Sequence, residues 1–141
     1  MYKILIIAGQ PSGDNLGSKL IKEMKIQFEE KFHSNNSKKK ELLFQGIGGL
    51  KMQNEGFVCL YKIEELSIMG FFDVFKRIRK IYSIIFALSN YTKVWKPDLI
   101  ITIDSPDFCF RLVNKIRKID KFVPIIHYVA PSVWAWRPKR A

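Results

Sequence analysis

The fold of this chain is decided by residues 98–108, which read Asp98-Leu99-Ile100-Ile101-Thr102-Ile103-Asp104-Ser105-Pro106-Asp107-Phe108. The apolar, β-branched first part predicts a strand buried on both faces, as in the middle of a parallel sheet. The apolar run stops at Asp104, and Ser105-Pro106-Asp107 then provides a turn and the start of a helix. Open α/β sheets bind ligands beyond the carboxyl ends of their strands. Asp104 is therefore the candidate for chemistry, whereas Asp107 is better suited to the alternative role of capping the helix.

Length, composition and charge limit the class of protein. The 141 residues are 48% hydrophobic and 26% charged, an ordinary composition for one globular domain. The net charge of +11 favours anionic partners such as phospholipid headgroups, nucleotides or nucleic acid, without choosing among them. Cys59 and Cys109 lack metal-ligand spacing, which favours reduced thiols. Because no apolar run approaches the roughly 20 residues of a membrane-spanning helix, we expect a cytoplasmic protein or one on a membrane surface.

The first 30 residues predict a strand, a tight turn and a helix. An apolar run over residues 2–8 leads into Gly9-Gln10-Pro11-Ser12-Gly13-Asp14, after which apolar residues recur at helical spacing. Ser12 or Asp14 can cap a helix whose first N–H groups favour an anion. The turn has neither the G-x-G-x-x-G pattern nor the ending of a P-loop. A structural turn and a ligand-binding loop therefore both remain open.

A second glycine-rich turn follows a strand predicted at residues 42–45. It reads Gly46-Ile47-Gly48-Gly49, and a short helical turn at 51–56 and a strand at 57–61 come next. These glycines admit the close approach of a ligand, although a turn between a strand and a helix needs them as well. The polar residues 33–40 before this unit predict a surface loop.

Large apolar residues surround Gly70 between two predicted elements. For Ile68, Met69, Phe71 and Phe72 we expect a contact with a hydrophobic ligand or a membrane. The helix that follows carries one broad apolar face, and a basic cluster, residues 76–80, lies elsewhere on it. For the body of this helix, packing on the sheet with a solvated basic side is favoured over a contact with anionic lipid.

The rest of the chain completes an alternation of strands and helices. A helix is predicted from Phe108 to Ile119, and a strand is predicted over residues 122–128. Such alternation implies right-handed βαβ units and a mostly parallel sheet. The predicted fold class is α/β, Rossmann-like with flanking helices, in one domain over residues 1–141.

Five blocks of residues, in order and at fitting spacing, resemble the lipid-A-disaccharide synthase family. The blocks are Ala8-Gly9-x-x-Ser12-Gly13-Asp14, Gly46-Ile47-Gly48-Gly49, Glu64-Glu65-Leu66-Ser67-Ile68-Met69-Gly70, Ile103-Asp104-Ser105-Pro106-Asp107-Phe108 and His127 to Arg137. The resemblance runs nearly end to end, and the last two blocks are highly specific. Two positions depart from the family pattern, because Gln10 stands where a glutamate is usual and Ala130 where a serine is common. A role for a carboxylate at position 10 is therefore not carried over.

The resemblance implies an inverting glycosyltransferase built from two Rossmann domains, the GT-B architecture. It implies that UDP-2,3-diacylglucosamine is joined to 2,3-diacylglucosamine 1-phosphate with release of UDP, and it implies no metal or redox cofactor. Since the family is more than twice as long, we expect this chain to be the acceptor-side half without the donor-binding C-terminal domain. We expect it to be inactive alone, and to have that C-terminal half and an anionic membrane surface as partners. The implied location is cytoplasmic and peripheral on the inner membrane.

The resemblance also assigns site residues. Asp104 matches the family's aspartate and is the expected general base. The expected substrate-binding residues are Ser12, Gly13, Asp14, Gly48, Gly49, Met69, Phe72, His127, Ser132 and Trp134. Two alternatives stay open, a non-catalytic half-enzyme and a basic α/β binding module. The positive net charge and the aromatic segment Trp134-x-Trp136-Arg137 favour the binding module. The sequence has no recognised nucleic-acid motif, however, so we expect no nucleic acid as partner.

Overall fold

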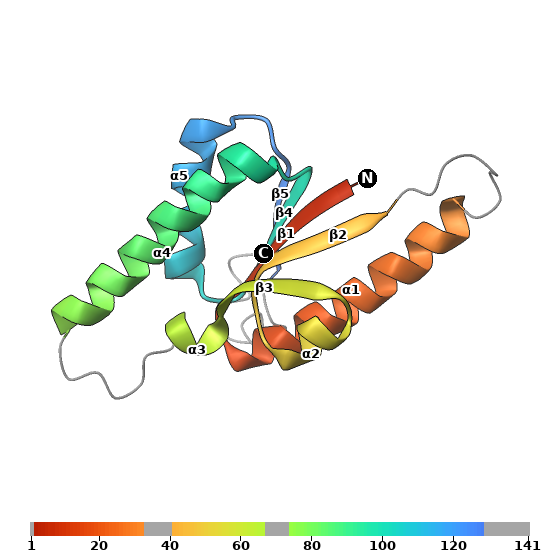
Figure 1. The fold of residues 1–141 in the computed structure, drawn as a ribbon, viewed down its shortest axis with the longest axis horizontal. Helices are drawn as coiled ribbons and strands as arrows, with labels where there is room; N and C mark the ends of the chain where they lie inside the picture. Colours follow the sequence, from red (N-terminus) through yellow and green to blue (C-terminus); the bar gives the residue numbers. More distant parts are fainter. Residues whose placement is uncertain (1, 33–40, 67–73, 129–141) are drawn as a thin grey trace, which may run out of the picture.

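A computed structural model of the chain describes residues 2–32, 41–66 and 74–128. Strands and helices alternate along these residues (Figure 1). The elements are β1 (Tyr2–Ala8), α1 (Pro11–Phe32), β2 (Leu42–Gly48), α2 (Leu50–Asn54), β3 (Phe57–Lys62), α3 (Ile63–Leu66), α4 (Val74–Trp95), β4 (Leu99–Ile103), α5 (Pro106–Ile119) and β5 (Ile125–Tyr128).

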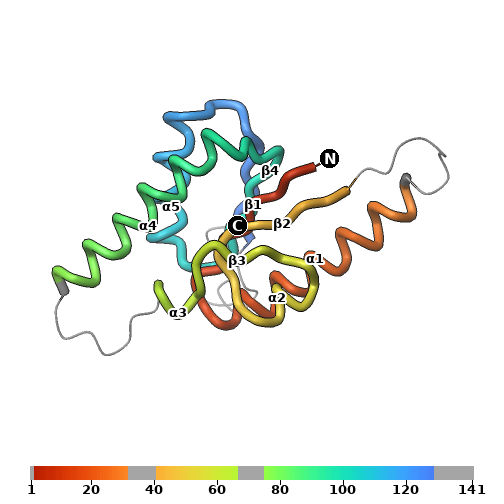
Figure 2. Tube along the Cα trace, viewed as in Figure 1, coloured from red at the N-terminus to blue at the C-terminus, as the bar shows by residue number. Residues whose placement is uncertain are grey.

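The five strands form one sheet in the order β3-β2-β1-β4-β5, and every neighbouring pair is parallel. Helices α4 and α5 pack together on one side of the sheet, and α1 and α2 pack together on the other (Figures 1 and 2). This arrangement confirms the predicted α/β, Rossmann-like fold. Strand β4 lies beside β1 at the centre, as the apolar run of residues 99–103 predicts.

The hydrophobic core lies around the two central strands. Leu5, Ile6 and Ile7 of β1 and Ile100 and Ile103 of β4 have no exposed surface. Strands with helices on both faces bury both sets of side chains, which explains the unbroken apolar runs in the sequence. These runs therefore fix which two strands form the centre of the domain.

Two strand boundaries differ from the sequence prediction. Strand β2 continues past Gln45 to Gly48, because Gly46, at φ 143°, follows a path on which a Cβ atom would lie 2.0 Å from the carbonyl oxygen of Ile6. Strand β5 begins at Ile125 instead of Phe122. The carboxylate of Asp120 accepts hydrogen bonds from the N–H groups of Phe122 and Val123, which holds those residues in a turn.

The apolar residues of α4 occupy two faces instead of one. Ile84, Ile85 and Leu88 are buried, as expected for a helix packed on a sheet. Five others, Phe75, Ile78, Tyr82, Phe86 and Val94, are exposed. The body of the helix therefore packs on the sheet as expected, but part of the broad apolar face predicted for it is exposed. None of the described helices has the length and apolar content to cross a membrane.

Candidate functional site

The carboxyl ends of β1, β2 and β4 meet at one edge of the sheet. The chain proceeds from β1 outward to β2 and β3, then returns to β4 on the other side of β1. The direction of strand succession therefore reverses between β1 and β4, and at such a reversal an open α/β sheet has the crevice that binds ligands. Gly9 follows β1 at this point and Asp104 follows β4.

Asp104 is largely enclosed at the end of β4. The residue is 8% exposed, and its N–H group donates to the carbonyl oxygen of Tyr128 at 3.0 Å. The hydroxyl of Ser12 lies 3.5 Å from the Oδ2 atom of Asp104, although the two residues are 92 positions apart. The structure thus brings the turn before α1 and the carboxylate after β4 to one place.

The backbone at this place adopts a conformation that most residues avoid. Asp104 has φ 52° and Ser105 has φ 47°, both in the left-handed region. Each such residue costs on the order of 1 kcal/mol, so the surrounding structure must hold the pair in place. Cys109 does so with two bonds, from its N–H to the carbonyl of Ser105 at 3.0 Å and from its thiol to the carbonyl of Asp104 at 3.3 Å.

The start of α5 corrects one sequence interpretation. Ser105, not Asp107, is the residue at the N-cap position, and its side chain makes no capping hydrogen bond. Asp107 lies within the first turn of the helix, where a carboxylate interacts favourably with the helix dipole. The left-handed turn at Asp104 and Ser105 starts the helix at Pro106, one residue before Asp107. Asp107 is therefore inside the helix and is not its N-cap residue.

Gly9 and Gly13 let β1 and α1 approach the end of β4. A Cβ atom at Gly9 would lie 2.2 Å from the hydroxyl oxygen of Ser105. A Cβ atom at Gly13 would lie 3.1 Å from that of Ala8 and 3.4 Å from the Cγ2 atom of Ile103. The glycines of this turn therefore have a packing reason, and the predicted substrate role of Gly13 stays a prediction.

The carboxylate of Asp14 is bound by the start of α2. It accepts hydrogen bonds from the N–H groups of Gly49 at 3.1 Å, Lys51 at 3.2 Å and Met52 at 3.0 Å. The interpretation that Ser12 or Asp14 caps α1 is therefore wrong, since both residues lie inside this helix, which begins at Pro11, and Asp14 caps α2 from outside. A Cβ atom at Gly49 would lie 2.5 Å from the carboxylate, and one at Gly48 would lie 2.6 Å from the sulfur of Met52.

A hollow opens beside these two glycines. It has a volume of about 360 Å³ and is lined by Gly48, Gly49, Leu50, Gln53, Lys62 and Glu64. It lies at the carboxyl ends of β2 and β3, two strands away from β4. Neighbouring strands are about 4.8 Å apart, so the nearer side of the hollow, at the end of β2, lies roughly 10 Å from the end of β4 along the same edge.

Cys109 lies behind the site and is 1% exposed. Burial raises the pKa of its thiol to about 12, with the nearby hydroxyl of Thr102 opposing the rise and the negative charge of Asp104 adding to it. The thiol is therefore neutral at physiological pH and serves as a hydrogen-bond donor to the backbone. Both cysteines are free thiols, in agreement with the sequence analysis.

His127 is exposed on β5, and one of its ring nitrogens is bound. Its Nδ1 atom lies 2.5 Å from the hydroxyl oxygen of Thr102, and its ring lies 5.7 Å from that of Phe110. The sequence analysis singled out His127 and missed Thr102. A signal was present, because Thr102 is the one hydroxyl in the otherwise apolar run of β4.

The remaining predicted site residues, Met69, Phe72, Ser132 and Trp134, lie outside the described residues. Residues 68–72, for which we expected a hydrophobic or membrane contact, lie outside them as well. Within the described parts of the chain, no three His, Cys, Asp or Glu residues are grouped as metal ligands. The part of the candidate site that the structure describes therefore comprises Asp104, Ser12, the capped turn at Gly48 and Gly49, and His127, and their roles stay predictions.

Comparisons with known proteins give a consistent result. The sequence model of the family described as lipid-A-disaccharide synthetase matches residues 4–141. The lipid-A-disaccharide synthase of Rhodopseudomonas palustris strain CGA009 is 40% identical over 138 residues, which are 98% of this chain and 33% of that protein. The synthase of Wigglesworthia glossinidia brevipalpis is 44% identical over 136 residues, which are 96% of this chain and 32% of that protein. The chain spans about a third of the length of the curated relatives it matches.

Proposed function

The chain belongs to the lipid-A-disaccharide synthetase family, and on that premise we propose that it acts as the acceptor-side Rossmann domain of a GT-B glycosyltransferase. The proposed reaction joins UDP-2,3-diacylglucosamine to 2,3-diacylglucosamine 1-phosphate and releases UDP. The name of the curated relatives supports this reaction. The observation that carries it is the enclosed carboxylate of Asp104 at the reversal of strand order. The proposal requires a second Rossmann-like domain as partner, to hold the nucleotide-sugar.

In the proposed reaction Asp104 is the general base. Its carboxylate takes the proton from the acceptor hydroxyl while that oxygen forms a bond to the anomeric carbon of the donor sugar. The bond from this carbon to UDP breaks, and its electron pair leaves with UDP. The configuration inverts because the attack comes from the face opposite the leaving group. The contact of Ser12 with Oδ2 supports this role, since it restricts the orientation of the carboxylate.

We assign the acceptor sugar to the region between Ser12 and the hollow beside Gly48. The positive end of the dipole of α1, a helix of 22 residues, favours the acceptor's phosphate. The negative charge of Asp14 is directed instead at α2, where three N–H groups bind it. The separation of roughly 10 Å between the nearer side of the hollow and the end of β4 is one that a phosphorylated, acylated sugar can bridge.

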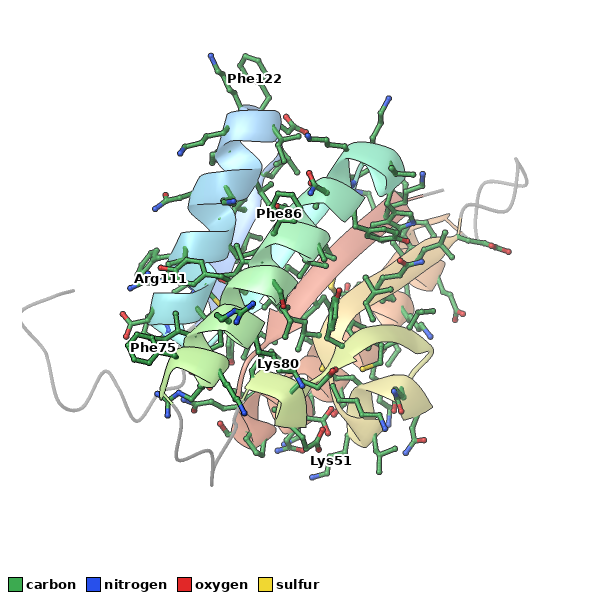
Figure 3. The ribbon with its side chains drawn as sticks, turned by 60° about the vertical axis from the view of Figure 1, so that its left-hand side comes forward. Lys51, Phe75, Lys80, Phe86, Arg111 and Phe122 are labelled. Carbon is green, nitrogen blue, oxygen red and sulfur yellow. The ribbon has the colours of Figure 1, made fainter. Side chains whose placement is uncertain are left out.

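We further propose that the outer side of α4 and α5 faces an anionic membrane, on the cytoplasmic surface of the inner membrane. The surface, here called the α4–α5 stripe, consists of Phe75, Ile78, Tyr82, Phe86, Arg111 and Lys115. Phe75 is 79% exposed and Phe86 is 59% exposed. Figure 3 shows Phe75, Phe86 and Arg111 on these two helices.

Basic side chains accompany the aromatic rings of the α4–α5 stripe. The guanidinium of Arg111 donates a hydrogen bond to the hydroxyl of Tyr82 and lies 5.7 Å from the centre of the Tyr82 ring. The ammonium of Lys115 lies 5.2 Å from the ring centre of Phe86. The basic residues 76, 77, 79 and 80 are also exposed along α4. Exposed aromatic rings beside Lys and Arg are typical of interfacial helices. Since both proposed substrates carry acyl chains, such a surface would bring the site to them.

The decisive experiment is a reconstitution assay. The chain is incubated with both acylated sugars, alone and together with the remaining part of the Rhodopseudomonas palustris relative, which this chain does not cover. We expect disaccharide only in the mixture. With Asp104→Asn we expect turnover to fall by on the order of 100-fold or more, because the base is lost.

The matched control is Asp107→Asn, which removes a carboxylate three residues away on α5. It should keep near-normal turnover. Full turnover by the isolated chain would contradict the requirement for a donor domain. Undiminished turnover by Asp104→Asn would remove Asp104 from the role of base.

A further inference from the structure

We propose that Thr102 is a positioning residue that holds His127 as a hydrogen-bond donor toward the substrate, and so leaves the role of base to Asp104. This inference rests on the proposed function, because it assigns roles within the same site. It concerns two residues on neighbouring strands, one buried and one exposed.

The structure fixes the His127 ring from two sides. Thr102 and His127 are direct partners in the parallel register of β4 and β5, and Thr102 is 1% exposed. The hydroxyl oxygen of Thr102 lies 2.5 Å from Nδ1 of His127. The ring of Phe110 lies against the imidazole at 5.7 Å, inclined by 30°. A buried hydroxyl and an aromatic ring therefore set the orientation of an exposed side chain.

The direction of this hydrogen bond follows from the neighbours of Thr102. A hydroxyl has one proton to donate, and two acceptors are near it: Nδ1 of His127 and the sulfur of Cys109. The thiol of Cys109 uses its own proton on the carbonyl of Asp104. Since a neutral sulfur is a weak acceptor and an imidazole nitrogen a good one, the hydroxyl donates to Nδ1. The neutral ring then carries its proton on Nε2.

This tautomer determines what His127 can do. Among the described residues none bonds to Nε2, so this N–H is available to a ligand. An N–H group donates and does not remove a proton, so the ligand atom opposite it is an oxygen acceptor such as a phosphate, hydroxyl or acyl carbonyl oxygen. The role of base then stays with the carboxylate of Asp104, as in the proposed reaction.

Nuclear magnetic resonance of the ¹⁵N-labelled chain tests the tautomer directly. The chain has two histidines, His33 and His127, and the signals that disappear in a His127→Gln variant belong to His127. In the unaltered chain we expect the neutral His127 ring to be protonated on Nε2, with Nδ1 as acceptor. Thr102→Val, which removes the hydroxyl at nearly constant volume, should abolish the hydrogen-bonded Nδ1 signal. Thr102→Ser, which keeps the hydroxyl, should restore it.

A proton on Nδ1 in the unaltered chain, or an unchanged His127 signal in Thr102→Val, would overturn the inference. A second arm titrates the chain with glucosamine 1-phosphate as the probe. We expect it to shift the Nε2–H signal of His127, with binding about tenfold weaker in Thr102→Val. If the tautomer is as expected but the probe leaves His127 unmoved, the donor role is overturned. The glycosyltransferase proposal is still decided separately, by the Asp104→Asn assay.

Discussion

Asp14 and Lys25 lie about three turns apart on one side of α1 and hold the two ends of α2. Asp14 binds the N–H groups at the start of α2, and the ammonium of Lys25 donates to the carbonyl of Glu55 at its end. A carboxylate at the first end and a cation at the last both complement the helix dipole. A helix of five residues is too short to be stable alone, so α1 supplies its stability.

The first prediction concerns Asp14. Asp14→Ala leaves three N–H groups without their acceptor, and we expect it to lower the free energy of unfolding by about 2 kcal/mol. Asp14→Asn, which keeps one acceptor oxygen, should cost less. Urea denaturation measures both, and Glu30→Ala, an exposed carboxylate of the same helix, is the control. Equal stability of the Asp14→Ala and Glu30→Ala variants would argue against the capping role.

The second prediction concerns the left-handed backbone at Ser105. Ser105→Gly removes the steric cost of φ 47°, and we expect a gain of roughly 1 kcal/mol in the free energy of unfolding. Lys96→Gly, at φ 53° and away from the site, is the matched control for the same relief of strain. If Lys96→Gly stabilises the chain and Ser105→Gly does not, the Ser105 side chain has a compensating role.

The third prediction is a coupling between Gly9 and Ser105. Gly9→Ala alone should destabilise the chain by about 1–3 kcal/mol, because the new methyl group collides with the Ser105 side chain. In the Ser105→Gly background that side chain is absent, and most of the loss should disappear. Thermal unfolding of the four chains gives the coupling free energy. Strictly additive effects would show that the two residues do not touch.

The fourth prediction concerns Cys109 and pH. An unfolded thiol ionises with a pKa near 8.5, whereas burial raises the pKa of Cys109 to about 12 in the folded chain. The stability that this thiol contributes is therefore complete below pH 8.5 and is lost as the pH rises toward 12, by up to about 1.4 kcal/mol per unit. Urea titrations between pH 8 and 10.5 should show a steeper loss for the original chain than for Cys109→Ser. Parallel slopes would place the thiol in a more polar environment.

The fifth prediction concerns the α4–α5 stripe. Replacing Phe75 and Phe86 by serine should weaken cosedimentation with phosphatidylglycerol vesicles by about tenfold or more, because both rings lose apolar contact with the membrane. Salt should weaken the binding of the original chain without abolishing it, since screening acts only on the charges. Phe122→Ser is the control, because this ring is 91% exposed but lies outside the stripe (Figure 3). An equal effect of the control would mean non-specific adsorption.

The central part of the fold could be predicted because its signals are local. The apolar run of residues 99–103 identifies the central strand, and the change to polar residues at Asp104 marks its end. The alternation of strand and helix patterns then requires a parallel sheet. The reversal between β1 and β4 follows only once the strand order is known, and sequence periodicity does not provide that order.

The parts that were missed depend on contacts between distant residues. Asp14 was interpreted from its own helix, whereas its partners lie 35 to 38 residues further along the chain. The division of the α4 residues into a buried and an exposed face depends on which side of the helix meets the rest of the domain. The partnership of Thr102 with His127 depends on strand register, which places residues 25 positions apart side by side.

The contact between Asp14 and Gly49 has a consequence for the design of inhibitors. The N–H groups of a glycine turn are ordinarily an attractive anchor for an acidic compound. Here those groups are already occupied, and the carboxylate that occupies them would repel a second anion. A compound directed at the hollow should therefore present uncharged hydroxyl or amide groups to Gly48 and Gly49.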